Sequence, residues 1–196
     1  MNIEDSIKNN LKKNQTCVTS LDGKSEIIKE IIEQLINARN KGQTIFTLGN
    51  GGSGSTSSHF VSDLLKTAIT VDSKRFKAIS LVDNIPVNLA WANDVSYDSI
   101  FSEQLQNFLN SGDIVIGFSG SGNSANVVNA LQYAKTKGAI AIAISGMTGG
   151  KIAKISDVSL IVPSNDMLII ESMHLLTCHC IIEIIRSLGK PLFTYE

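Results

Sequence analysis

Residues 44–66, TIFTLGNGGSGSTSSHFVSDLLK, join a buried-strand pattern to a helix pattern through a glycine-rich loop. The apolar run at 44–48 is typical of a buried strand. Glycines follow, then Ser and Thr residues that favour a helix N-terminus, then an apolar helical pattern beginning at Phe60. N–H groups at such a helix start bind anions, because glycine permits close approach and the helix dipole favours negative charge. The stretch therefore predicts a phosphate site.

One turn into this expected helix, His59 and Asp63 are four residues apart and so share a face. An imidazole and a carboxylate behind a phosphate cradle suggest chemistry on a phosphorylated small molecule.

The whole chain alternates apolar runs with helical patterns, which predicts an α/β fold with a parallel sheet and right-handed crossovers. We expect a three-layer αβα sandwich with a five-stranded, flavodoxin-like sheet in the order 2-1-3-4-5, plus N-terminal helices. The mixed segment 84–101 is expected to hold Trp91, Asn93 and Asp94 in or near a loop. The expected strands are 44–48, 77–82, 113–118, 139–144 and 158–162.

A second loop, SGSGNS, follows the third strand and contains Ser119, Gly120, Ser121 and Ser124. Capping the next helix needs only one serine, so three hydroxyls between glycines favour phosphate contact. In the predicted strand order, this loop and the first one flank the switch point and face one crevice.

Two nucleotide-binding patterns explain this sequence less well than a simple phosphate site does. The first loop also matches G-x-G-x-x-G, the dinucleotide fingerprint, with Asp83 after the second strand. Asp83 lies about 30 residues on, where about 20 is usual, and a dinucleotide site needs no second serine loop. A P-loop motif is absent from the sequence, which disfavours a nucleoside triphosphatase.

Charge and cysteine content restrict the remaining classes of function. The 196 residues carry 17 basic and 18 acidic side chains, without a basic stripe or polybasic cluster. We therefore expect no nucleic-acid and no membrane partner. The three cysteines lack disulfide-framework spacing, and residues 1–14 lack the apolar core of a signal peptide, so a cytoplasmic protein is expected.

The most apolar segment, 167–188, is expected to be a buried helix because its ionisable side chains would be costly in a bilayer. Its Cys-His-Cys triplet points in different directions on a helix, so the cysteines are read as small core residues. A lone buried histidine is usually structural. Two histidines and a glutamate on one helix, beside His59 and Asp63, instead favour a site; these three are Glu171, His174 and His179.

The combination of GNGGS followed by HF, then SGSGNS, then E-x-x-H-x-x-x-x-H resembles the sugar isomerase (SIS) domain family, and within it the phosphoheptose isomerase branch. The resemblance spans essentially the whole chain. It implies one SIS domain over 1–196, with N-terminal helices at 1–42, an α/β core at 43–163 and a C-terminal helix at 164–190. It also implies a ketose–aldose phosphate isomerase, most simply of sedoheptulose 7-phosphate, that is a homotetramer with sites between subunits and often binds zinc.

The resemblance also implies roles for individual residues. Asp63 and His179 match the catalytic base and acid/base. Zinc or another divalent ion, one per site, would be held by His59, Asp63, Glu171 and His179. The implied substrate-binding residues are Asn50, Gly51, Gly52, Ser53, Asn93, Asp94, Ser119, Gly120, Ser121, Ser124 and Glu171.

This chain departs from the family pattern at several of these positions. Asp63 replaces the family's glutamate, Glu171 its glutamine and Gly120 its threonine, and Thr67, beside Lys66, stands where an arginine is expected. These changes leave a second interpretation open. Some related SIS proteins bind phosphosugars as regulators, or bind a partner such as the bacterial replication initiator, without catalysis.

Overall fold

The computed structural model describes residues 2–194 and contains one five-stranded sheet. All neighbouring strands are parallel, in the order β2-β1-β3-β4-β5, which confirms the predicted order. β1 and β3 are therefore the neighbours at the switch point. The strands are β1 (Thr44–Gly49), β2 (Lys77–Ser80), β3 (Ile114–Ser119), β4 (Ile140–Ser145) and β5 (Val158–Ile161).

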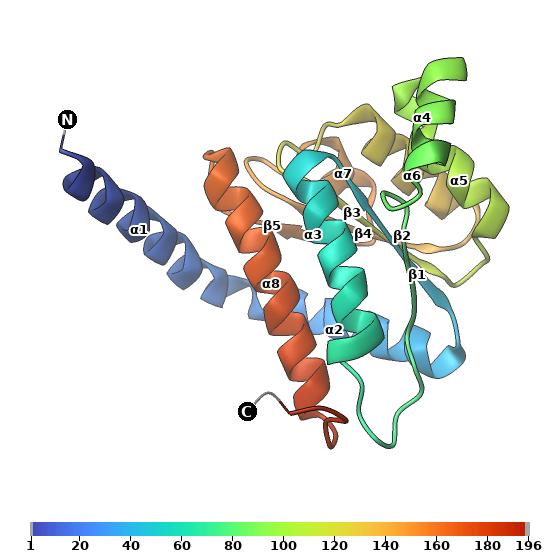
Figure 1. The fold of residues 1–196 in the computed structure, drawn as a ribbon, viewed down its shortest axis with the longest axis horizontal. Helices are drawn as coiled ribbons and strands as arrows, with labels where there is room; N and C mark the ends of the chain where they lie inside the picture. Colours follow the sequence, from blue (N-terminus) through green and yellow to red (C-terminus); the bar gives the residue numbers. More distant parts are fainter. Residues whose placement is uncertain (1, 195–196) are drawn as a thin grey trace.

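Helices cover both faces of the sheet, so the three-layer αβα architecture is confirmed (Figure 1). Aliphatic side chains on the two faces of the strands form two separate cores. One face carries α2 (Ser25–Lys41), α3 (Gly51–Ser62) and α8 (Met167–Ser187). The other carries α5 (Ile100–Phe108), α6 (Ala125–Thr136) and α7 (Gly150–Ile155).

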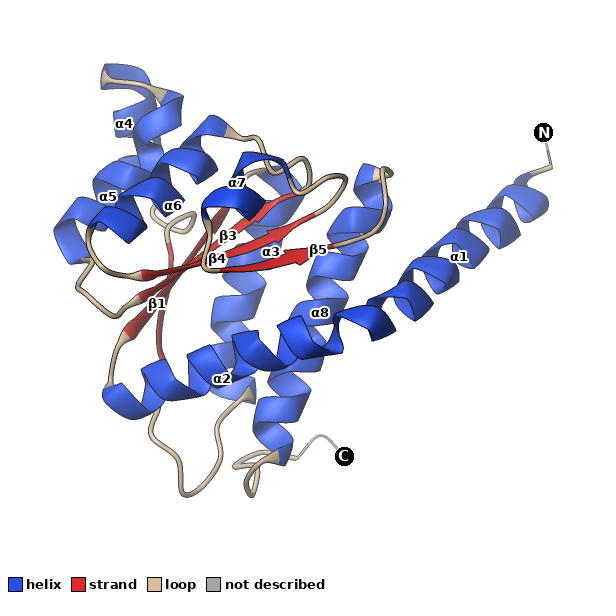
Figure 2. Ribbon diagram, turned by 180° about the vertical axis from the view of Figure 1, so that it is seen from behind, coloured by secondary structure: helices blue, strands red, loops and turns tan. Residues whose placement is uncertain are grey.

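The N-terminal helix α1 (Ile3–Ser20) extends away from this body (Figures 1 and 2). It continues through the short turn η1 (Leu21–Lys24) into α2. Only Cys17 of α1 is buried, while Ile3, Ile7 and Leu11 remain more than half exposed. The spacing of these three residues places them along one side of the helix.

The first loop is shorter than the sequence suggested. α3 begins at Gly51, directly after the cap residue Asn50, so most of the glycine-rich run is helical and Phe60 is not its start. Glycine costs about 1 kcal/mol in a helix relative to alanine. That cost is tolerated here because the turn must pack closely against its surroundings: a Cβ on Gly52 would overlap the Glu171 carboxylate.

The segment after β2 also differs from expectation. Residues 85–94 form α4 (Ile85–Asp94), so Trp91, Asn93 and Asp94 all lie in a helix, and Asn93 and Asp94 lie at its end, next to the loop at 95–96. Asn84 caps α4 by accepting a hydrogen bond from Val87 N. None of the residues of α4 is buried, so the helix leaves no strong amphipathic pattern in the sequence.

The apolar helix α8 is long and apolar enough to cross a membrane by length and composition, but half of its most apolar window is buried within the protein. It packs against α3, α2 and β4 as a core helix. Cys178 is buried, as predicted for a core residue. Cys180 is exposed, so that prediction was wrong for it, because its position on α8 borders the open groove between α2 and α8.

Candidate active site

A crevice of about 210 Å³ opens where β1 and β3 end. Both predicted loops and the start of α8 contribute to it, which confirms that the loops face one space. Its lining residues are Asn50, Ser53, Phe118, Ser119, Gly120, Ser121, Ser124, Met167 and Glu171.

Two helix N-termini open at this crevice, and in neither does the side chain of the cap residue bond to its own helix. Asn50 and Ser124 are the cap residues of α3 and α6, and neither makes a side-chain cap hydrogen bond. The capping explanation for Ser124 therefore fails. N–H groups at two helix starts, both helix dipoles and nearby hydroxyls suit an anion such as phosphate.

The second loop is held by its own hydroxyls. Gly122 N donates to Ser119 Oγ at 3.2 Å, and Asn123 N donates to Ser121 Oγ at 3.2 Å. The Ser119 and Ser124 oxygens are 3.3 Å apart. These bonds fix the loop before any ligand arrives.

Gly120, where related sequences are expected to carry threonine, faces Met167. A Cβ on Gly120 would overlap the Met167 sulfur. The thioether of α8 thus fills the space beside the loop, and the missing threonine leaves no gap in the crevice wall.

Glu171 lies at the junction of two hollows. It lines the crevice and also a second pocket of about 260 Å³, which includes His59. Its carboxylate packs against Gly52 in the first turn of α3, where the helix dipole favours negative charge.

Further along α3 and α8, three predicted site residues meet. His59 Nε2 and His179 Nε2 are 3.2 Å apart, and Asp63 Oδ2 lies 3.5 Å from His59 Nε2 and 3.8 Å from His179 Nε2. The two histidine side chains are about half exposed, and Asp63 is 15% exposed. Glu171, the fourth predicted ligand, is not part of this cluster.

These spacings fit a single tetrahedral ion. A Zn–N bond of about 2.0–2.1 Å places neighbouring ligand atoms about 3.3–3.4 Å apart. The three observed separations bracket that value. Two imidazole nitrogens and a carboxylate oxygen are also the donor set that zinc takes in proteins.

A change of helix type orients Asp63. α3 passes into the π-helical turn η2 (Asp63–Thr67), a feature often found at functional sites. Thr67 Oγ1 donates to Asp63 Oδ1 at 2.9 Å, while Oδ2 faces both histidines. The threonine found in place of the expected arginine therefore holds one oxygen of the carboxylate.

The crevice and the cluster lie along one seam between α3 and α8, which run side by side (Figure 1). Gly52 meets Glu171 near the helix starts, and His59 meets His179 seven and eight residues later. At 1.5 Å per residue the two contacts are roughly 10–12 Å apart.

Asn93 and Asp94 are not among the residues that line the crevice. They lie exposed at the end of α4, where Asn93 Nδ2 donates to Asp94 Oδ1 at 2.7 Å. His174 is fully buried on α8 beside Phe118, and burial lowers its pKa to about 4, with the Ser145 backbone partly opposing. His174 is thus a neutral core residue and no part of the cluster.

Sequence reasoning missed Asn126, Tyr97 and Met167. Asn126 stands two residues after Ser124 and forms hydrogen bonds with Asn50. Its position within SGSGNSAN was the available signal, but an asparagine inside a helix start suggested no specific role. Tyr97 and Met167 come from other elements and have no local motif.

Known proteins resemble most of this chain in sequence and in fold. Residues 12–146 match the family model of the SIS domain. A probable phosphoheptose isomerase from Thermoplasma volcanium is 39% identical over 82% of this chain and 81% of its own length. The phosphoheptose isomerase of Citrifermentans bemidjiense is 35% identical, covering 92% and 94%. A solved phosphoheptose isomerase from Neisseria gonorrhoeae superimposes with a TM-score of 0.89 at 27% identity, covering 95% of this chain and 100% of its own.

Proposed function

Because this chain belongs to the SIS domain family and, within it, to the group of the phosphoheptose isomerases, we propose that it is an aldose–ketose isomerase acting on a sugar phosphate. Its substrate is sedoheptulose 7-phosphate or a related phosphosugar, and the product of the former is D-glycero-D-manno-heptose 7-phosphate. The observation that carries the proposal is the shared seam, with an anion crevice at one end and an acid–base cluster at the other.

The length of the seam supports a long sugar. An extended carbon chain advances roughly 1.3 Å per bond, given C–C bonds of about 1.5 Å. From C2 to the phosphorus of a heptulose 7-phosphate is therefore roughly 9 Å, against roughly 4 Å for a triose phosphate. The separation of roughly 10–12 Å along the helices suits the longer molecule.

In the proposed reaction, Asp63 removes the proton from C1 of the ketose and returns it to C2 of the enediol. His179 moves the accompanying proton between the two sugar oxygens. The phosphate binds at the crevice, far from the reacting carbons, and this binding holds those carbons in the correct orientation. No other group is oxidised or reduced, because hydrogen only changes place within the sugar.

We propose His59, Asp63 and His179 as ligands of one divalent ion, zinc by donor type, with Glu171 completing the set. The fit of the three separations supports this. Such an ion would polarise the sugar oxygens and stabilise the developing oxyanion. Glu171 would first have to turn away from Gly52 toward the cluster.

The test is turnover of sedoheptulose 7-phosphate by the purified protein, followed by NMR, with metal content measured on the same sample. We expect the aldose phosphate to form and about one equivalent of divalent metal per chain. Tight binding of the sugar phosphate without product would contradict the enzyme and favour a phosphosugar-binding regulator.

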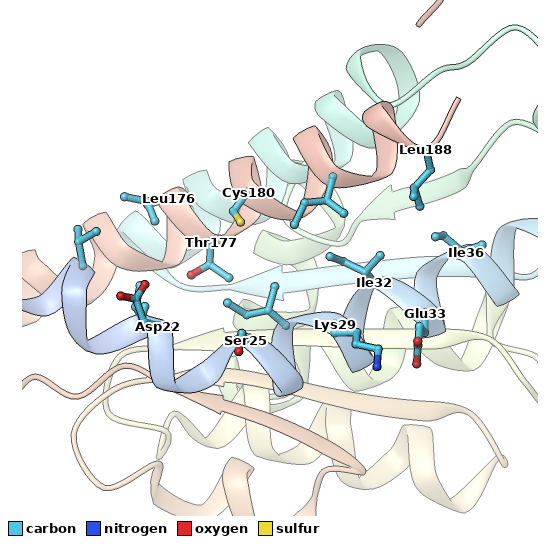
Figure 3. A pocket seen from close by; sticks show the side chains of 14 residues that line it. Asp22, Ser25, Lys29, Ile32, Glu33, Ile36, Leu176, Thr177, Cys180 and Leu188 are labelled. Carbon is cyan, nitrogen blue, oxygen red and sulfur yellow. The ribbon is translucent and has the colours of Figure 1, made fainter. Parts of the chain in front are cut away.

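We further propose a homotetramer. An apolar groove of about 500 Å³ runs between α2 and α8, lined largely by aliphatic side chains (Figure 3). The exposed stripe of α1 adds to the apolar surface that one chain leaves uncovered. Light scattering should give a mass of four chains at micromolar concentration. Ile184→Lys, which puts a charge in the groove, should reduce that mass, and a monomeric wild-type protein would contradict the proposal.

Two smaller proposals complete this account. Residues 1–196 act as one SIS domain, supported by a core that α2, the sheet and α8 share. The protein works in the cytoplasm, supported by three cysteines that are all free.

A further inference from the structure

Asn126 joins the two loops of the crevice through a pair of side-chain hydrogen bonds. Asn50 Nδ2 donates to Asn126 Oδ1 at 2.9 Å, and Asn126 Nδ2 donates to Asn50 Oδ1 at 2.8 Å. Asn126 is 1% exposed and stands at the start of α6, whereas Asn50 caps α3. The pair therefore links two helix starts that both open at the crevice.

The orientation of both amides follows from one backbone group. Val127 N donates to Asn126 Oδ1 at 3.0 Å. Because a backbone N–H can only donate, that atom of Asn126 must be the oxygen. The other atom is then the nitrogen, and the Asn50 atom facing it must be the oxygen.

Tyr97 completes the bonding of Asn50. Its hydroxyl donates to Asn50 Oδ1 at 2.9 Å. Tyr97 belongs to the turn η3 (Tyr97–Ser99), which α6 holds through a bond of 2.9 Å from Asn129 Nδ2 to the Asp98 carbonyl oxygen. The same helix thus supports both partners of Asn50.

A count of donors and acceptors shows which group of the Asn50 side chain is still available to a ligand. Its oxygen accepts two bonds, which is its full capacity, and its NH₂ group donates one of its two hydrogens to Asn126. One N–H remains without a partner among residues 2–194, on a side chain that lines the crevice.

We propose that Asn126 and Tyr97 are positioning residues that fix the Asn50 amide, so that it offers a phosphate oxygen one N–H donor and no acceptor. This rests on the proposed function in taking the ligand to be a phosphosugar. The fixed amide makes the crevice selective for a group with several hydrogen-bond acceptors, such as phosphate. An inverted amide would instead turn its oxygen toward the anion and repel it.

Two variants test the orientation. Tyr97→Phe removes only the hydroxyl of a half-exposed side chain, and Tyr133→Phe, also a hydroxyl deletion but further along α6, is its control. Asn126→Asp keeps the shape but turns the donor into an acceptor when ionised. The ionised variant therefore loses the bond that Asn126 Nδ2 donates to Asn50 Oδ1.

We expect Tyr97→Phe to raise KM for sedoheptulose 7-phosphate about fivefold, with kcat nearly unchanged. Asn126→Asp should raise KM at least about tenfold relative to wild type near pH 8, again with kcat nearly unchanged. Tyr133→Phe should match wild type. An unchanged KM for either variant, or a loss that appears in kcat instead of KM, would overturn the inference.

The proposed function can fail separately. If the wild-type protein does not turn over the sugar, the same ratios are measured as Kd for inorganic phosphate. The same pattern there supports the positioning of Asn50 without the reaction, and a flat pattern overturns it. If Asn126→Asp does not fold, Tyr97→Phe decides alone.

Discussion

The crevice and the cluster at the two ends of the α3–α8 seam are built in different ways. The crevice uses helix N-termini, a loop closed by its own hydroxyls and the paired amides of Asn50 and Asn126. The cluster consists of three side chains on helix surfaces, two of them about half exposed. The proposed phosphate recognition would therefore follow from the fold, while the proposed chemistry would depend on the reach of a few side chains.

The departures from the family pattern have different consequences in the two regions. At the crevice, Gly120 is matched by Met167, and the backbone donors are unaffected. At the cluster, Asp63 is one methylene shorter than the expected glutamate. Between the two regions, Glu171 is a carboxylic acid where an amide is expected. A displacement of about 1 Å at a reacting centre can cost about 100-fold in rate, so the cluster is where this protein can differ from its relatives.

The largest effect is expected at the cluster. Asp63→Asn keeps the shape but removes the base, and should lower kcat by about 10³-fold, within the range for general-base catalysis. Kd for inorganic phosphate should not change, because the crevice lies elsewhere. Asp63→Glu is the matched variant and should keep measurable turnover. Retention of more than a tenth of the rate in Asp63→Asn would remove Asp63 as the base.

The next effect belongs to the crevice. The double variant Ser121→Ala, Ser124→Ala should weaken sugar-phosphate binding by about 3 kcal/mol or more, since a hydrogen bond to a charged group contributes about 1.5–3 kcal/mol. Affinity for the free sugar should stay the same. Calorimetry with both ligands measures this, and an equal loss for both would show that these serines do not bind phosphate.

Glu171 lies between the two regions, so its variant tests to which one it belongs. Glu171→Gln should lower metal affinity about 10–100-fold, a size typical when a supporting ligand is lost, and leave phosphate affinity intact. Metal titration of the variant and wild type provides the comparison. Unchanged metal affinity would limit the metal set to His59, Asp63 and His179.

The last effect concerns the stability of the core that supports the seam, and not binding or turnover. Burial lowers the pKa of His174 to about 4 from 6.5, so between these values the unfolded chain binds the additional proton. Stability should therefore rise with pH across this window and fall by up to about 3 kcal/mol on acidification to about pH 4. Denaturant unfolding of wild type and His174→Gln should show that the variant lacks this part of the slope. Identical slopes would mean that His174 does not contribute.

Sequence reasoning reached the backbone-determined parts of the molecule. Strand order, the placement of both glycine-rich loops at one crevice and the meeting of His59 with Asp63 follow from apolar periodicity and helical spacing. It failed where tertiary contacts decide. α3 starts at Gly51 because its glycines must pack closely, and α4 forms without a buried face. The side-chain direction of Glu171 and the bonding of Asn126 depend on neighbours distant in sequence.

The central claim is that the crevice and the cluster bind the two ends of one sugar phosphate. A crystal structure of the protein with sedoheptulose 7-phosphate tests it most directly. The account predicts the phosphate between Ser53, Ser121 and Ser124, with C1 and C2 within about 3.5 Å of the Asp63 carboxylate or His179 Nε2, the distance of a reactive pose. A phosphate bound outside the crevice, or reacting carbons pointing away from the cluster, would contradict it.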